Sequence, residues 1–515
     1  MICMIKQFIL VIMLVSMFSF SVYAQIDNPY TIDYLKVDII QTGEIDTTGR
    51  VEDMELTLSI PQNDQYQKVE NIESNVNYTE YYDDIGNKYL KLKWIKPEVV
   101  NKFRVKTTVT INRRNTMDVE KFPEFIDSTQ LVDYDTNDID VLSKTFRGND
   151  IDKIFSVATW VNKNIKYDME YAQVNMSASW VLENRKGVCD EITTLFVALT
   201  RSMGYYSPYI AGYAYSKDAN SMDGFVAHGW AEVNGIPVDV TWSQGGFLDA
   251  THIKFAKLAD SSYTQASLNA RGLGSFKVDL KDITTEITTV ENTESLIIGS
   301  TSSLLDDIVY KGYVVVKSDV TSDRCVLTKL KVQGCIDSSG ENVMRNTENN
   351  DAFYFCNQRK VFSILELLDE GNALGLYKCP IVVLPYGGET ETVSVKVSFE
   401  NEKKVDLSTD KTNLAAGEEY SVYAKDSYIF TSNGDFAYQK SQFIAPHNDF
   451  ILYGYNSGTL VSENMHVTDT NSILIETEVS QPDIEIIVEK PEDVSIGFFS
   501  MIFNMFSNLF KGLSI

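Results

Sequence analysis

The segment that most constrains the fold places one cysteine at the start of an amphipathic helix. Gly187-Val188-Cys189 opens this segment, and Gly204 stands where a helix commonly ends. We therefore expect Cys189 at a helix N-terminus, where the helix dipole and unpaired backbone N–H groups favour its thiolate. Apolar residues recur at the spacing of a helix with one buried face, namely Ile192, Leu195, Phe196, Leu199 and Met203.

The two residues after the cysteine oppose that effect. Asp190 and Glu191 suit the positive end of a helix, but negative charges beside a sulfur disfavour the loss of its proton. A further group, from later in the chain, must therefore help to ionise Cys189.

A β-hairpin is predicted around Asn234-Gly235, the strongest two-residue signal for a hairpin turn. With these residues as the turn, Val233 faces Ile236. The same register puts His228 and Asp239 on one face of the ribbon, as diagonal neighbours. Such neighbours lie about 7–8 Å apart at the backbone, within reach of a hydrogen bond between a carboxylate and an imidazole.

A cysteine, a histidine and an aspartate are the components of a nucleophilic triad. In this interpretation His228 takes the thiol proton of Cys189, and Asp239 fixes the imidazole tautomer and stabilises its charge. The backbone N–H of Cys189 and a neighbouring donor would hold the oxyanion. Taken singly, a buried cysteine and a core histidine are more commonly structural. The chain has only four histidines, however, and one lies diagonally opposite an aspartate, which favours the triad.

The same segments, in this order, resemble the transglutaminase-like superfamily of papain-type thiol enzymes. The resemblance covers about residues 140 to 260. It implies an α+β fold, in which a papain-like transglutaminase core of helices packed on an antiparallel sheet is flanked by β-sandwich domains. It also implies that Cys189 is the nucleophile, His228 the general base and Asp239 its orienting partner. The matching segments are Lys186-Gly-Val-Cys189-Asp-Glu191, Leu199-Thr-Arg-Ser-Met-Gly204, His228-Gly-Trp-Ala-Glu-Val233 and Pro237-Val-Asp239.

The sequence departs from the family pattern at two positions. Gly229 stands where alanine is usual and Val240 where proline is common, and neither change removes a reacting group. The segment Asp249-Ala-Thr-His252 resembles a recurring element of microbial members, in which we interpret His252 as structural. The side chain that would complete the oxyanion site is left open. Trp160 and Trp180 are candidates, although their amphipathic helices favour a place in the core.

The resemblance brings no cofactor or metal requirement with it, because no acidic site matches the calcium sites of the eukaryotic enzymes. The acidic stretch that begins at Asp133 lacks the glycine and the closing glutamate of a calcium loop, so we interpret it as a linker. Zinc is the alternative to two disulfides for a group of four cysteines, but they form no C-x2-C pair and have no histidine among them. Disulfides are therefore predicted, in one of three connectivities, among Cys325, Cys335, Cys356 and Cys379.

Both ends of the chain carry apolar segments. Lys6, the apolar run 8–20 and Ala24 are typical of a signal peptide, which implies export to the extracellular space or cell surface. An uncleaved N-terminal membrane helix is the alternative. The C-terminal helix has polar residues along one stripe only, and about sixteen of its residues span about 24 Å, less than a hydrocarbon core of roughly 30 Å. It would attach to a membrane surface or dock on protein.

A chain of 515 residues is too long for one hydrophobic core. Short runs rich in Val, Ile, Leu, Thr and Tyr, separated by turn residues, predict β structure before residue 118 and after Gly274. We predict a signal peptide at 1–24, an N-terminal β-sandwich at 25–117, a transglutaminase-like catalytic domain with its linker at 118–300, a disulfide-bearing β domain at 301–402, a C-terminal β-sandwich at 403–490 and the C-terminal helix at 491–515.

The predicted chemistry is acyl transfer at peptide or glutamine amides of a protein or peptide substrate. Water as acceptor makes the protein a protease or amidase, whereas a lysine amine gives a crosslink. We favour hydrolysis, because water is the default acceptor and no dedicated amine site is evident. The competing class is a non-enzymatic adhesion or envelope protein that uses the fold as a binding module. The net charge of −27 argues against nucleic acid and anionic membranes as partners. The oligomeric state is left open.

Overall fold

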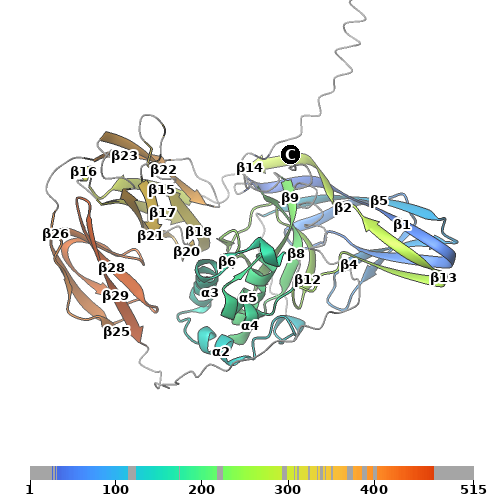
Figure 1. Ribbon diagram of the computed structural model, residues 1–515, viewed down its shortest axis with the longest axis horizontal. Coiled ribbons are helices and arrows are strands. Elements are labelled where there is room, and N and C mark those ends of the chain that lie inside the picture. Colours follow the sequence, from blue (N-terminus) through green and yellow to red (C-terminus); the bar gives the residue numbers. More distant parts are fainter. Residues whose placement is uncertain are drawn as a thin grey trace, which may run out of the picture.

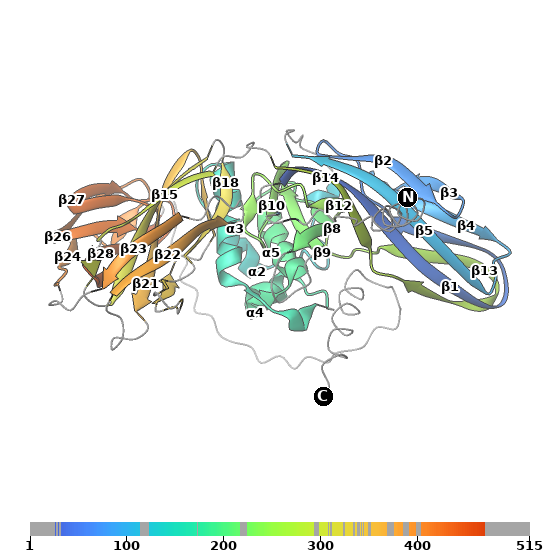
Figure 2. The same ribbon diagram turned by 90° about the horizontal axis from the view of Figure 1, so that it is seen from above.

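The computed structural model shows an elongated molecule in which a β sheet, a helical core and two further β modules follow one another along the long axis (Figures 1 and 2). It describes Ile26 and Pro29 and the ranges 32–113, 123–172, 174–216 and 224–292. It also describes residues 298–468 except 307, 310–311, 323–324, 333–334, 337–339, 341, 343, 349–351, 368–374, 385–390 and 398–402.

The N-terminal sheet is built around one long strand. In the first half of β1 (Ile32–Ser59), buried residues alternate with more accessible ones, as expected for a strand with one face on a core. The strand has neighbours along both of its edges. It pairs directly with β4 (Lys88–Ile95), β5 (Val100–Asn112), β13 (Ala266–Leu280) and β14 (Thr284–Asn292). The sheet also contains β2 (Gln67–Ser74), which pairs with β5, and β3 (Tyr78–Tyr82), which pairs with β4.

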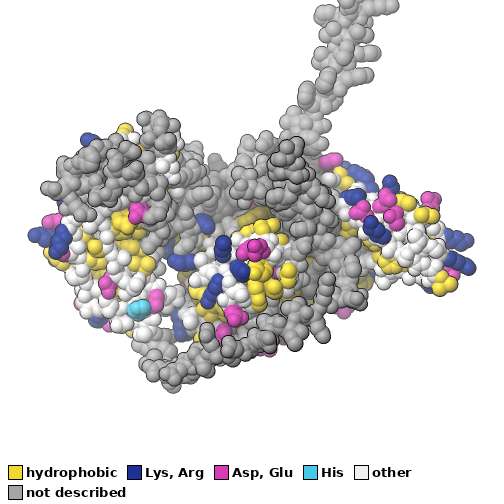
Figure 3. Space-filling model, in the orientation of Figure 1, with side chains coloured by type: hydrophobic (Ala, Val, Ile, Leu, Met, Phe, Trp, Pro, Cys, Tyr) yellow, Lys and Arg dark blue, Asp and Glu magenta, His cyan; other side chains and the backbone are white. Residues whose placement is uncertain are grey.

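Two of these strands, β13 and β14, come from the range 118–300, which the sequence predicts to be the catalytic domain. β13 and β14 both pair antiparallel with β1, so residues 266–292 belong to the N-terminal sheet and not with the core at 118–300. The physical reason is that the second edge of β1 needs a partner along its whole length, which the strands before residue 118 do not supply. On this sheet acidic and basic side chains lie interspersed (Figure 3), for example in the ion pair between Lys91 and Glu55.

The core packs helices against an antiparallel sheet. Helix α5 (Cys189–Ser202) lies at its centre and is buried from Cys189 to Arg201, not along one face only as its spacing predicted. Other helices and the sheet enclose it, and Thr193, Thr194 and Thr200 find hydrogen-bond partners inside. The remaining helices are α2 (Asn137–Ser143), α3 (Asp150–Asn164) and α4 (Ala178–Asn184), and the strands are β8 (Tyr209–Ser216), β9 (Gly224–Val233), β10 (Ile236–Asp239), β11 (Gln244–Gly245) and β12 (Ile253–Leu258). A short parallel pair, β6 (Lys166–Tyr167) and β7 (Lys186–Gly187), leads into α5.

The core sheet continues into the disulfide-bearing module, because Gly245 of β11 pairs with Leu327 of β18. The strands on this side are β16 (Ile308–Val309), β18 (Val326–Val332), β20 (Ala352–Phe355), β22 (Gly375–Leu384) and β23 (Glu391–Val397). A second sheet contains β15 (Ile298–Leu304), β17 (Tyr313–Ser322), β19 (Met344–Glu348) and β21 (Gln358–Leu367). The last module contains β24 (Leu407–Thr409), β25 (Asn413–Ala415), β26 (Glu419–Thr431), β27 (Phe436–Ile444), β28 (Phe450–Asn456) and β29 (Thr459–Thr468).

Two disulfides are present, as predicted, and the structure selects one of the three connectivities. Cys325 is bonded to Cys356, and Cys335 to Cys379. All four sulfurs are therefore used, which excludes the alternative of a zinc site on these cysteines. Among the described residues Cys189 is the free cysteine.

Loss of the longer crosslink is expected to destabilise the disulfide-bearing module. The bond between Cys335 and Cys379 closes a sequence separation of 44 residues. In the chain-entropy model a loop of that length is worth about 4 kcal/mol. A Cys335→Ser/Cys379→Ser variant should therefore unfold at lower urea concentration than the wild type, as followed by intrinsic fluorescence. An unchanged midpoint would show that the crosslink contributes nothing to stability.

Two predicted segments, the signal peptide at 1–24 and the C-terminal helix at 491–515, lie outside the described residues. Within the part of the chain that the structure describes, none of the helices has both the length and the apolar character needed to cross a bilayer.

Candidate active site

The predicted hairpin is present with the predicted register. β9 and β10 pair antiparallel, and Val233 faces Ile236. Asn234 and Gly235 form the turn with φ angles of 46° and 81°, the left-handed conformations that a two-residue hairpin turn of this type requires at both positions. The Asn-Gly turn therefore sets the register of the hairpin, and the register determines which face of the ribbon carries His228 and Asp239.

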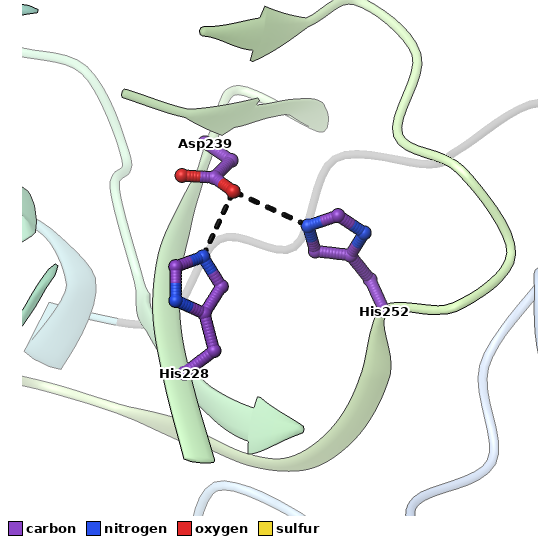
Figure 4. Close-up of side chains that lie close together, drawn as sticks. All are labelled: His228, Asp239 and His252. Atoms are coloured by element: carbon purple, nitrogen blue, oxygen red, sulfur yellow. Dashed lines mark hydrogen bonds and ion pairs between the residues drawn. The ribbon is translucent and has the colours of Figure 1, made fainter. Parts of the chain in front are cut away.

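His228 and Asp239 are hydrogen bonded inside the protein. His228 Nε2 lies 2.8 Å from Asp239 Oδ2, and the two side chains are 3% and 0% exposed (Figure 4). Burial alone would raise the pKa of Asp239, but the imidazoles of His228 and His252 hold that pKa well below its usual range. Since Nε2 is used by the carboxylate, Nδ1 is the ring nitrogen of His228 that is left for a reactant.

Cys189 is the first residue of α5, as the sequence predicted, and only 3% of it is exposed. Burial and the neighbouring Asp190 raise the pKa of its thiol, while a hydrogen bond with the backbone of Gly229 lowers it. Gly229 directly follows His228, so this contact brings the sulfur to the histidine strand. Because burial and the nearby carboxylates outweigh that hydrogen bond, the resting sulfur is a thiol. A base is needed to remove its proton.

The two acidic residues after the cysteine are not simple surface anions. Glu191 accepts hydrogen bonds from the backbone N–H of Val188 at 3.0 Å and of Met176 at 3.4 Å, so its side chain caps the start of α5. Burial raises the pKa of Glu191 to about 7. Asp190 is buried and accepts a hydrogen bond from the Tyr209 hydroxyl at 2.5 Å. Burial, followed by the charge of Glu191, raises the pKa of Asp190 well above its usual value. Burial therefore disfavours the charged form of Asp190, which weakens the repulsion that the sequence predicts between this carboxylate and the Cys189 thiolate.

Two further side chains that the sequence did not assign to the site contact the His–Asp pair. The Trp242 ring stacks on the imidazole of His228, with centroids 4.2 Å apart and planes 14° from parallel. The backbone N–H of Trp242 also donates to Asp239 Oδ1 at 3.1 Å. On the other side of the carboxylate, His252 Nε2 lies 3.3 Å from Asp239 Oδ2 (Figure 4). The sequence signal for Trp242 was its position three residues after Asp239. His252 was marked by the resemblance of the segment 249–252, but only as a structural residue.

Comparison with known proteins supports the interpretation of this region. Residues 142–246 match the family model of the transglutaminase-like superfamily. This segment is a transglutaminase-like core. It runs from the end of α2 to just beyond β11 and contains Cys189, His228 and Asp239. The β modules on both sides of it agree with the predicted fold class.

Solved structures of two kinds of protein are similar to the chain. A candidate cysteine protease from Cytophaga hutchinsonii is 17% identical, covers 50% of this chain and 92% of its own, and has a TM-score of 0.38. The transglutaminase of red sea bream is 9% identical, covers 81% of this chain and 92% of its own, and has a TM-score of 0.19. A candidate protease from Parabacteroides distasonis is 12% identical over 64% of this chain and 69% of its own, with a TM-score of 0.18. No curated protein sequence matches the chain.

One group of side chains at the candidate site could be considered for a metal ion. Within the described residues, His228, Asp239 and His252 bring ligand atoms within 4.8 Å of one another. Both imidazoles, however, approach the same carboxylate oxygen at hydrogen-bond distance. Metal ligands direct their lone pairs at a common point and not at each other, so this geometry fits a shared hydrogen-bond acceptor better than a metal site.

Trp160 and Trp180, the two candidates for an oxyanion donor, are partly buried and pack against the hydrophobic core of the helices. Trp160 also contacts Phe146 edge-on, and Trp180 contacts Tyr171. These contacts favour the core role that their helical spacing predicted, so the backbone N–H of Cys189 remains the predicted oxyanion donor.

Proposed function

We propose that this protein is a thiol enzyme that transfers acyl groups from peptide or glutamine amides, with Cys189 as nucleophile, His228 as general base and Asp239 as the residue that orients the base. The single observation that carries the proposal is the buried 2.8 Å hydrogen bond between His228 and Asp239 on a hairpin whose Gly229 also contacts the cysteine sulfur.

The first half of the reaction forms a thioester. Nδ1 of His228 accepts the proton of the Cys189 thiol, and the sulfur attacks the carbonyl carbon of the amide. The oxyanion that develops is held by the backbone N–H of Cys189. The imidazolium of His228 then gives its proton to the amide nitrogen, the C–N bond breaks and ammonia or an amine leaves.

The second half regenerates the enzyme. His228 removes a proton from the acceptor, which attacks the thioester carbon and displaces the Cys189 sulfur, and the proton returns to that sulfur. With water as acceptor the product is a carboxylic acid, and with a lysine amine it is an amide crosslink. We favour water. Two disulfides are compatible with an oxidising compartment, and we propose that the protein acts outside the cytosol on protein or peptide substrates.

Alkylation by iodoacetamide tests the proposed Cys–His pair without requiring a substrate. Because burial raises the pKa of the Cys189 thiol, its reactivity near pH 6 should depend on proton transfer to His228. A His228→Ala variant should therefore alkylate at least about tenfold more slowly than the wild type between pH 6 and 7. The measurement is the mass of the Cys189 peptide over time in the full chain, without reductant, so that the disulfides stay intact.

The matched control is His466→Ala. His466 also lies 3.3 Å from an aspartate, Asp449, but this pair is largely exposed and lies on the C-terminal module. The control variant should alkylate at the wild-type rate. Equal rates in the wild type and the His228→Ala variant would leave Cys189 without a base and would refute the proposed mechanism.

A further inference from the structure

Asp239 lies between two histidines, and only one of them belongs to the proposed triad. Its Oδ2 atom is 2.8 Å from Nε2 of His228 and 3.3 Å from Nε2 of His252 (Figure 4). Its Oδ1 atom accepts the backbone N–H of Trp242 at 3.1 Å. Both oxygens of the carboxylate therefore have partners, so its direction depends on all three neighbours.

His252 is itself held from its other side. Nδ1 lies 3.4 Å from Asp249 Oδ1 and 3.3 Å from the Asp249 carbonyl oxygen. Asp249 in turn accepts hydrogen bonds from the Gln244 side chain at 2.8 Å and from the Thr251 backbone N–H at 2.9 Å. The His252 carbonyl oxygen accepts a hydrogen bond from Arg113 Nη2 at 2.7 Å, so the N-terminal sheet also fixes this residue.

The acceptors on both sides of His252 favour a charged ring. A neutral imidazole donates from one nitrogen only, whereas an imidazolium donates from both and can bridge Asp239 and Asp249. Burial lowers the pKa of His252, but the two carboxylates outweigh it and raise the pKa to about 9. The groups that face the ring are these two carboxylates, the His228 imidazole, the rings of Trp230 and Trp242, and Arg113 at its carbonyl. His252 is thus a buried cation at neutral pH.

We propose that His252 is a positioning residue of the reaction centre, whose imidazolium bridges Asp249 and Asp239 and keeps Oδ2 of Asp239 aligned with Nε2 of His228. The inference rests on the proposed function for its effect on turnover, but the bridge itself can be measured without turnover. It replaces the purely structural role that the sequence suggested. Arg113, which follows the last residue of β5, anchors the His252 backbone. The N-terminal sheet therefore also helps to hold His252 in place.

Kinetics of His252 variants test the effect on the reaction. His252→Phe removes both N–H groups at similar volume, and kcat should fall about 10- to 100-fold with KM within about threefold, the range typical of residues that orient a reacting group through another. His252→Gln can still donate to Asp239 and should recover part of that loss. The wild-type kcat should decline as pH rises through about 9, where His252 loses its proton, and this decline should be absent in His252→Gln. His466→Gln, on the exposed His–Asp pair, should match the wild type throughout.

A titration of the histidines by NMR tests the bridge separately. With ¹³C-labelled histidine, the His252 signal, assigned from its loss in His252→Gln, should titrate with a midpoint near pH 9. Asp249→Asn should lower that midpoint toward the ordinary value of about 6.5.

A wild-type midpoint below pH 7 would overturn the bridge. A wild-type kcat in His252→Phe, or a loss of kcat with an unchanged pH profile, would overturn the positioning role. If the wild type turned over no peptide, the proposed function would fail, and the NMR midpoint would still decide on the bridge.

Discussion

Replacing Cys189 with serine is expected to abolish turnover of peptide substrates, with kcat/KM falling at least about 10⁴-fold. Serine has nearly the same shape, so the packing at the start of α5 should not change. Its hydroxyl is, however, far harder to deprotonate than a thiol, and the site is built for a group that His228 can ionise. The assay is a peptide library with a labelled primary amine present, analysed by mass spectrometry. New carboxylic acids report hydrolysis, and labelled peptides report transfer to an amine.

The control for this experiment lies on the same helix. Ser202 at the other end of α5 contacts Ser143 through a side-chain hydrogen bond of 3.0 Å, far from the sulfur in sequence. Ser202→Ala removes one hydroxyl of a half-buried pair at the far end of the helix, and turnover should stay within about twofold of the wild type. Thermal unfolding of Cys189→Ser at the wild-type temperature would show that the fold is intact. Residual turnover above about 1% in this variant would mean that another group is the nucleophile.

The relation between His228 and Asp239 could be predicted because it depends on local structure alone. Asn234-Gly235 determines the turn, the turn determines the register, and the register determines which side chains share a face. The position of Cys189 at the start of α5 was predictable for the same reason, since the helix signals surround it in the sequence. Both predictions concern residues whose relative placement needs few contacts from outside the element.

The features that the sequence did not reveal all depend on contacts between distant segments. β13 and β14 pair with β1 across more than two hundred residues of chain. The local sequence of a strand does not indicate which distant strand it pairs with. The bridge of His252 exists because β12 pairs with β8 and brings the preceding residue to Asp239. The disulfide connectivity follows from the folded module in the same way.

Burial accounts for a second kind of difference between sequence and structure. The spacing of apolar residues in α5 predicted one buried face, but the threonines between them are buried as well, because a hydroxyl can bond within a helical core. Asp190 looked like a surface anion and is instead a buried acid that accepts a hydrogen bond from Tyr209. A sequence reports residue types, whereas the charge state of a carboxyl depends on how far the fold removes it from water.

An Asp239→Asn variant is expected to lose about 10²- to 10⁴-fold in kcat while KM stays within about threefold, because the substitution changes the tautomer of His228 and not the shape of the site. The backbone N–H of Trp242 needs the acceptor oxygen at the Oδ1 position, which leaves the amide NH₂ facing both imidazoles. His228 would then present its lone pair at Nε2 and carry its proton on Nδ1, where it cannot accept the thiol proton. Steady-state kinetics between pH 5 and 10 measure the loss. Asp249→Asn, which acts on His252 only, should lose about tenfold or less. Equal losses in the two variants would mean that Asp239 does not orient His228 directly.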